Sequence, residues 1–222
     1  ASDLVCEHGP PGHQKITDVV TLYMNPPKNS AVITVDEKPD IQAVERPNGY
    51  VRTRTGTIIR GKKSTCERHG TKTNLFAAAD IKKGKARTKT YDRKRRVEFV
   101  KFMYYVVKSV PDASDPDNGI KIHVVLDNYC THKGCEERLA GHKNVFMHFT
   151  PTDASWLNLG EVFFGKIQRK LLKNGNFKSK REMLQAIRDF VNVHNKNGIP
   201  YRWRKREVKG TQLRNIPTNF CN

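Results

Sequence analysis

The chain has 222 residues, of which 36% are hydrophobic, which is enough for one domain with a full core. Its 41 Lys and Arg residues exceed its 22 Asp and Glu residues, and the formal net charge of +19 predicts a polyanionic partner, with nucleic acid favoured over acidic membranes. No run reaches the roughly 18 apolar residues of a membrane span, no signal-peptide pattern opens the chain, and five irregularly spaced cysteines favour a reducing compartment over a disulfide framework.

The first half of the chain predicts strands joined by turns. Residues 1–30 are mixed in composition and interrupted by prolines, so we expect a lead-in segment or linker there. A first strand is expected over Ala31–Val35, and the polar stretch 38–68 predicts a long loop with room for a hairpin. Two further strands, Thr73–Ala79 and Lys85–Tyr91, flank a turn and predict an antiparallel pair.

The second half predicts alternating helices and strands. In chain order these are a helix capped by Asp92, a strand over Ile120–Leu126, a short helix over Gly134–Gly141, a strand over Asn144–Phe149, a helix that carries Glu161, and a helix begun by the capping box Ser179–Glu182. This order predicts an α/β, RNase H-like fold with a mixed five-stranded sheet flanked by helices. We expect this domain to span residues 31–197, followed by a basic tail over residues 198–222.

Three acidic residues form the candidate catalytic site. Asp36 and Asp127 each follow an expected strand, and Glu161 lies on an amphipathic helix downstream. If the strands are parallel neighbours, about 4.8 Å apart, the aspartates meet at the carboxyl edge of the sheet. Carboxylates suit Mg²⁺ or Mn²⁺, and two such ions about 3.5–4 Å apart can cut or join phosphodiesters. Taken singly, each acid is more often a turn former or a surface residue, and Asp153 is a rival third ligand.

Basic residues predict a path for DNA beside these acids. At about 100° per residue, the helix of Glu161 places Leu157, Phe164, Ile167 and Leu171 on one face. The nearly opposite face carries Lys166, Arg169, Lys170 and Lys173, which form either a DNA track or an ordinary solvated face. Phosphate contacts are also expected from two basic runs, represented by Arg93, Lys94, Arg95, Arg96, Arg202, Arg204 and Lys205. Zinc sites at Cys130, His132, Cys135 and His142, or at Cys66 with His69, are a less favoured alternative. In the first set, the gap from Cys130 to Cys135 is wider than the usual spacing of zinc ligands.

Several motifs resemble those of DDE transposases, most closely the bacterial insertion-sequence branch of the mariner superfamily. They are Val35-Asp-Glu-Lys-Pro-Asp-Ile-Gln42, His69-Gly-Thr71 with Thr73-Asn-Leu-Phe-Ala77, Leu126-Asp-Asn-Tyr129 with Thr131-His-Lys133, and His148-Phe-Thr-Pro-Thr152 with Ala154-Ser-Trp-Leu-Asn158 and Glu161.

The resemblance implies a metal-binding triad of Asp36, Asp127 and Glu161, with two Mg²⁺ or Mn²⁺ ions. It also implies cleavage of double-stranded DNA at transposon ends and joining of the 3′ ends to target DNA, commonly at TA. Further implications are supporting roles for Asn128, His132, Trp156 and Asn158, a homodimer assembled on DNA, and a cytoplasmic, nucleoid-associated location in a bacterium.

The chain also departs from the family pattern. Leu159 and Gly160 replace the usual glutamine and β-branched residue, and a glycine inside a helix, costing about 1 kcal/mol, is expected to loosen the placement of Glu161. Residues 1–30 are too short for the helix-turn-helix domains that precede such catalytic domains, so we expect a catalytic portion of a transposase. Two alternatives remain: a catalytically inactive, transposase-derived DNA-binding protein, and an RNase H-fold nuclease that acts on RNA–DNA hybrids or junctions.

Overall fold

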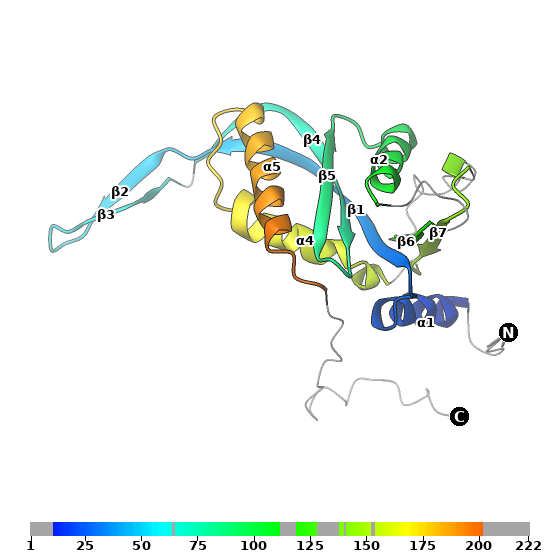
Figure 1. Cartoon of the computed structure of the whole chain (residues 1–222). Helices are drawn as coiled ribbons and strands as arrows, with labels where there is room; N and C mark the ends of the chain where they lie inside the picture. Colours follow the sequence, from blue (N-terminus) through cyan, green and yellow to red (C-terminus); the bar gives the residue numbers. More distant parts are fainter. Residues whose placement is uncertain are drawn as a thin grey trace, which may run out of the picture.

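The computed structural model describes residues 11–63, 65–111, 119–127, 138–139, 141–151 and 154–201. Its centre is a five-stranded sheet in the order β5-β4-β1-β6-β7 (Figure 1). The strands are β1 (Ser30–Glu45), β4 (Glu67–Asp80), β5 (Lys85–Tyr91), β6 (Lys121–Leu126) and β7 (Val145–Phe149). Strands β5, β4 and β1 are antiparallel neighbours, whereas β1, β6 and β7 run parallel. The predicted mixed sheet is therefore confirmed.

Helices cover both faces of this sheet (Figure 1). Helix α2 (Arg96–Lys108) packs on one face, where its Phe99 and Phe102 meet residues such as Ile33 of β1. The other face is covered by α1 (Pro11–Met24), the short turn η1 (Ser155–Leu157), α4 (Gly160–Ile167), its continuation η2 (Gln168–Leu172) and α5 (Lys180–Lys196). The first six residues of β1, Ser30–Val35, are buried on both sides, and they form a nearly continuous apolar run.

A two-stranded arm extends away from the sheet (Figure 1). It consists of β2 (Asn48–Arg52) and β3 (Ile58–Lys62), which pair antiparallel and confirm the predicted hairpin. The rest of the polar stretch 38–68 was wrongly predicted to be a loop, because β1 continues to Glu45 and β4 already begins at Glu67. Two register shifts near Ile41 interrupt the β1 extension, and the first six residues of β4 are mostly exposed, so neither extension shows a regular apolar alternation in the sequence.

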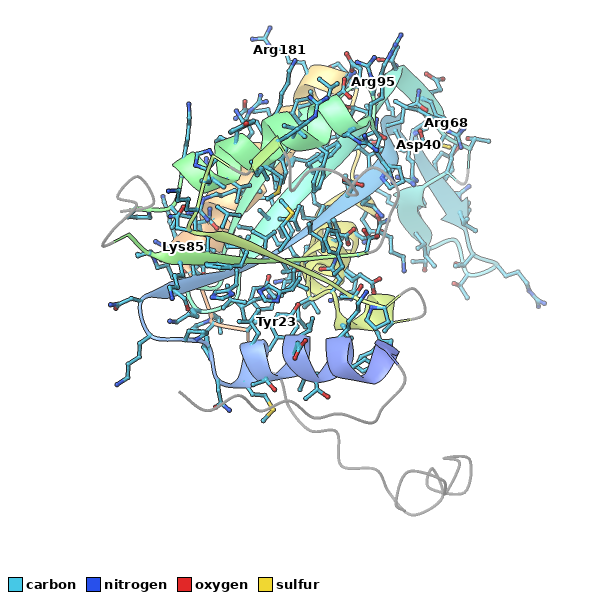
Figure 2. The ribbon with its side chains drawn as sticks, turned by 90° about the vertical axis from the view of Figure 1, so that its right-hand side faces the viewer. Tyr23, Asp40, Arg68, Lys85, Arg95 and Arg181 are labelled. Atoms are coloured by element: carbon cyan, nitrogen blue, oxygen red, sulfur yellow. The ribbon has the colours of Figure 1, made fainter. Side chains whose placement is uncertain are left out.

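Helix α1 contributes to the core, although only Ile16–Met24 had enough apolar residues to suggest a short element. Its Val19, Leu22 and Tyr23 are buried against the sheet and η1. Tyr23 rises from α1 toward the sheet (Figure 2), and its hydroxyl donates to the carbonyl of Leu157 at 3.0 Å. This bond connects α1 with the segment that leads into α4. The division of the chain at residue 30 remains a prediction.

The helix caps agree with the sequence in one case and differ in another. Ser179 caps α5 as predicted, since its hydroxyl accepts the backbone N–H of Glu182 at 3.1 Å. Asp92 does not cap α2, which begins after Arg95. Its Oδ1 instead forms an ion pair with Nζ of Lys180 at 2.7 Å. The predicted helix 134–141 falls mostly outside the described residues. No helix in the described part is long and apolar enough to cross a membrane.

Candidate active site

The parallel pairing of β1 and β6 brings two of the predicted acids side by side. Thr34 of β1 pairs with Val125 of β6, and Asp36 and Asp127 each stand two residues further along. Because side chains alternate along a strand, both aspartates fall on the face of Thr34 and Val125, which α1 and α4 cover. The structure thus brings these two acids side by side. The prediction that Asp36 follows the end of its strand was wrong, because β1 continues to Glu45 and Asp36 pairs with Ala77 of β4.

The environment of the Asp36 carboxyl, including the other acids, shifts its pKa. Burial raises its pKa from 3.8 to about 7, while the backbone N–H of Glu37, which donates to Oδ1 at 2.7 Å, opposes this rise. The negative charges of Asp127, Glu37 and Glu161 also raise the pKa of Asp36. Both other members of the predicted triad therefore lie within electrostatic range of Asp36. A carboxyl in such surroundings favours a bound cation over its free ionised form.

Asn158 connects the strand of Asp36 with the helix of Glu161. The Asn158 side chain is 2% exposed, and its Nδ2 donates to the carbonyl of Val35 at 3.1 Å. Its Oδ1 accepts the backbone N–H of Gly160 at 3.0 Å and the hydroxyl of Thr34. Since Val35 precedes Asp36 and Gly160 precedes Glu161, this one amide fixes the spacing between both acids.

Gly160 permits the close approach of α4 to β1. A Cβ atom at this position would lie 2.8 Å from the Cβ of Asp36 and 3.0 Å from Oδ1 of Asn158. Gly160 is also the first residue of α4 and not an interior one, because the helix expected from Ser155 onward is divided into η1 and α4. The expected helix-interior penalty therefore does not apply, and the glycine brings the start of α4 against Asp36.

The remaining predicted supporting residues divide into two groups. Trp156 lies in η1 with 56% of its surface exposed, close in sequence to Asn158. Asn128, His132 and the rival ligand Asp153 lie outside the described residues, as do Cys130 and Cys135 of the alternative zinc site.

The segment α4–η2 has the predicted division into an apolar and a cationic side. Leu157, Phe164 and Ile167 are buried, and Leu171 is partly buried. Arg169, Lys170 and Lys173 are exposed. Lys166 is half-buried, with its Nζ 4.8 Å from the centre of the Tyr201 ring, and burial and the nearby cations Lys170 and Arg169 lower its pKa.

The π-helical turn η2 redirects the end of this segment. The backbone N–H of Lys173 donates to the carbonyl of Gln168 at 2.8 Å, five residues back. Such turns often occur at functional sites. Lys173 then lines a cavity of about 420 Å³ beside β1, together with Lys38 and Arg46.

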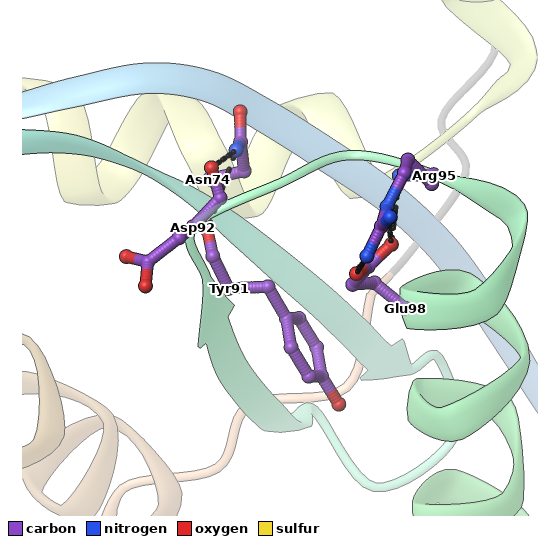
Figure 3. Close-up of polar contacts among 5 residues, drawn as sticks. All are labelled: Asn74, Tyr91, Asp92, Arg95 and Glu98. Carbon is purple, nitrogen blue, oxygen red and sulfur yellow. Dashed lines mark hydrogen bonds and ion pairs between the residues drawn. The ribbon is translucent and has the colours of Figure 1, made fainter.

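Two of the basic residues before α2 are held by internal ion pairs. Arg95 contacts Glu98, with Nε 3.1 Å from Oε2 (Figure 3). Lys94 lies 3.4 Å from Glu37, whose side chain is only 4% exposed. The prediction of phosphate contacts at this run therefore depends mainly on the exposed Arg93 and Arg96. Arg202, Arg204 and Lys205 lie outside the described residues.

A further cluster of potential metal ligands lies at the root of the arm and was not predicted. Glu45 pairs with Glu67 across β1 and β4, and His69 lies two residues further, with Nε2 2.9 Å from Oε2 of Glu45. Among the described residues, this is the one group of three whose ligand atoms all lie within 4.8 Å of one another, so the three predicted acids are more widely spaced. The hydrogen bond between His69 and Glu45 explains the contact of these two side chains without a metal.

The order of the mixed sheet and the helices on its two faces are those of an RNase H-like fold. A family model described as "DDE superfamily endonuclease" matches residues 32–184, and the chain belongs to this family. No curated protein matches the chain.

Solved structures of a mariner transposase have the same fold. The Mos1 transposase paired-end complex with left transposon end has a TM-score of 0.60 and 12% identity, covering 90% of this chain and 61% of that chain. The Mos1 mariner paired-end complex with Mn has a TM-score of 0.57 and 14% identity, covering 89% and 61%. The present chain thus spans less than two thirds of the length of these proteins.

Proposed function

We propose that this chain is the catalytic part of a DDE transposase, with its catalytic domain over residues 31–197. It cleaves double-stranded DNA at transposon ends and joins the freed 3′ ends to target DNA, using Mg²⁺ or Mn²⁺. The observation that carries this proposal is the position of Asp36 beside Asp127 and within electrostatic range of Glu161. Membership of the endonuclease family and the mariner-like fold support it.

The chemistry of the three side chains fits divalent cations. All three offer carboxylate oxygens, the hard ligands that Mg²⁺ and Mn²⁺ prefer. Burial is the main cause of the raised pKa of Asp36, and the negative charges of Asp127, Glu37 and Glu161 raise it further; a bound cation would neutralise that charge. When bound, two such ions would activate the attacking water or 3′-hydroxyl and stabilise the departing oxygen.

The protein's own contribution to the reaction is positioning. Asp36 and Asp127 stand on neighbouring strands of a rigid sheet, and Asn158 holds the start of α4, and with it Glu161, at a fixed distance from β1. These contacts keep the acids in place before substrate arrives, so little reorganisation accompanies the reaction.

DNA would be held by the cations that lie near the acids. Exposed Arg169, Lys170 and Lys173 continue from Glu161 along the same helical segment and would contact backbone phosphates. Exposed Trp156 can stack on a base. We propose further phosphate contacts from Lys166, Arg93, Arg96 and the tail residues Arg202, Arg204 and Lys205. The partner is double-stranded DNA, on which two copies assemble, in the nucleoid of a bacterial cytoplasm.

The proposal is tested by nicking of supercoiled plasmid DNA with Mg²⁺ or Mn²⁺. We expect Asp127→Asn to abolish nicking while DNA binding persists, and Asp189→Asn, an exposed acid on α5, to leave both unchanged. Nicking that survives Asp127→Asn would refute the proposed site. Salt-dependent DNA binding without cleavage under any metal would instead support the inactive alternative, and preferential cleavage of an RNA–DNA hybrid or junction would support the other nuclease.

A further inference from the structure

Thr150 follows β7 and buries a hydroxyl group that has no hydrogen-bond partner among the described residues. Thr150 is 1% exposed, and its Oγ1 makes no hydrogen bond to any group in the part of the chain that the structure describes. A buried polar group in this state lowers stability, because the group has lost its bonds to water without replacement. Such a group calls for a functional explanation.

The sheet register places Thr150 beside a predicted metal ligand. Leu126 of β6 pairs with Phe149 of β7, and the backbone N–H of Thr150 donates to the carbonyl of Leu126 at 2.8 Å. The next residues on the two strands are Asp127 and Thr150, one step beyond that pair. Since Val125 pairs with His148, alternation sets Asp127 and Thr150 on the same face. Three parallel neighbours thus present Asp36, Asp127 and Thr150 in a row at one edge of the sheet.

We propose that Thr150 is a positioning residue of the metal site, an inference that rests on the proposed function. In the metal-free structure this hydroxyl makes no hydrogen bond to Asp127; when a divalent cation is bound, it would donate to the Asp127 carboxylate and fix the orientation in which that carboxylate holds the cation. Carboxylates that bind metals are themselves held by hydrogen bonds from neighbouring groups, and loss of such a bond typically weakens metal binding about 10–100-fold. The hydroxyl therefore serves metal binding and not the folding of the metal-free chain.

This role predicts opposite effects on metal binding and on stability. Thr150→Val keeps the shape of the side chain and removes only the hydroxyl, whereas Thr150→Ser retains the donor. Mn²⁺ binding is measured by titration calorimetry, and unfolding of the metal-free protein is followed in urea. We expect Thr150→Val to weaken Mn²⁺ binding about 10–100-fold with an unchanged or higher urea midpoint, and Thr150→Ser to bind Mn²⁺ within about threefold of wild type.

Thr73 on β4 supplies the matched control. It is equally buried, at 1% exposure, but its hydroxyl donates to the carbonyl of Tyr91 at 3.0 Å, away from the acids. Thr73→Val should lower the urea midpoint and leave Mn²⁺ affinity unchanged. The inference about Thr150 is overturned if Thr150→Val binds Mn²⁺ as wild type does, or if Thr150→Ser loses affinity as the valine variant does. If the wild type itself binds no Mn²⁺, the proposed function fails as well.

Discussion

The charge of Asp36 destabilises the metal-free protein at neutral pH, and Asp36→Asn should remove this cost. Asparagine has nearly the same shape and can still accept the backbone N–H of Glu37. The pKa of Asp36 rises from 3.8 to about 7 on folding, mainly through burial. At about 1.4 kcal/mol for each unit of pKa, the ionised carboxylate costs the folded state about 4 kcal/mol.

The sign of the pH dependence follows from proton binding. Between about pH 4 and pH 7 the folded state holds more protons on Asp36 than the unfolded state does, so stability falls as pH rises through this window. The asparagine variant lacks this term. We therefore expect the variant to gain about 2–3 kcal/mol on the wild type between pH 5 and pH 8, measured by urea unfolding in EDTA.

Two outcomes distinguish the effect of burying Asp36 from a general effect of removing negative charge. The exposed Asp189→Asn variant should show no such widening, because its carboxylate is solvated in both states. The reasoning is refuted if the difference between Asp36→Asn and wild type stays constant with pH, or if the wild type gains on the variant as pH rises.

Three further outcomes follow from the same geometry. Mn²⁺ at 100 times its dissociation constant should add about 2.7 kcal/mol to the free energy of unfolding and raise the Tm of the wild type by about 5–10 °C. The affinity for Mn²⁺ should fall as pH drops below 7, where Asp36 holds its proton. A Tm that Mn²⁺ does not change would contradict the site. Gly160→Ala should cost about 1–3 kcal/mol by crowding Asp36, whereas Gly165→Ala on the same helix meets only the flexible Arg169 side chain and should be neutral or stabilising in thermal unfolding. Replacing Arg169, Lys170 and Lys173 with glutamine should reduce the slope of log K for DNA binding against log salt by about 0.9 for each phosphate that the variant no longer neutralises. Arg188→Gln on α5 should leave this slope unchanged. An unchanged slope in the triple variant would exclude its three cations from DNA binding.

The parts of the fold that the sequence predicted are those with local signals. The strand that ends before Asp127, the hairpin around Asp80–Gly84 and the cap at Ser179 each depend on residues close in sequence. The helical periodicity after Glu161 likewise gave the correct buried and cationic sides. By contrast, the extensions of β1 and β4 toward the arm were missed. In β1 the polar residues of 36–40 precede the buried Ile41 and Ala43, and in β4 the first six residues are mostly exposed.

The contacts that hold the candidate site together had no local signal. Asn158 bonds to Val35 and Thr34 across more than 120 positions of sequence. The fit of Gly160 against Asp36 likewise depends on the packing of α4 on β1, and read within its own helix this glycine suggested only a loss of helical stability. The motif resemblance identified Asn158 as a supporting residue, but only the three-dimensional arrangement indicates how it acts.

The burial of Ser30–Val35 on both faces of β1 is what makes the acidic Asp36 tolerable at the next position. Val32, Ile33 and Val35 are each 0% exposed, and fully burying one such side chain contributes about 1.5–3 kcal/mol. Together these three offset a cost of about 4 kcal/mol for an ionised Asp36. The same packing that stabilises the strand also prevents Asp36 from moving toward solvent to relieve its charge. The charge of Asp36 must therefore be neutralised by a proton or a cation. Variants that shorten Val32, Ile33 or Val35 are expected to lose the rigidity of β1 and the affinity for metal together.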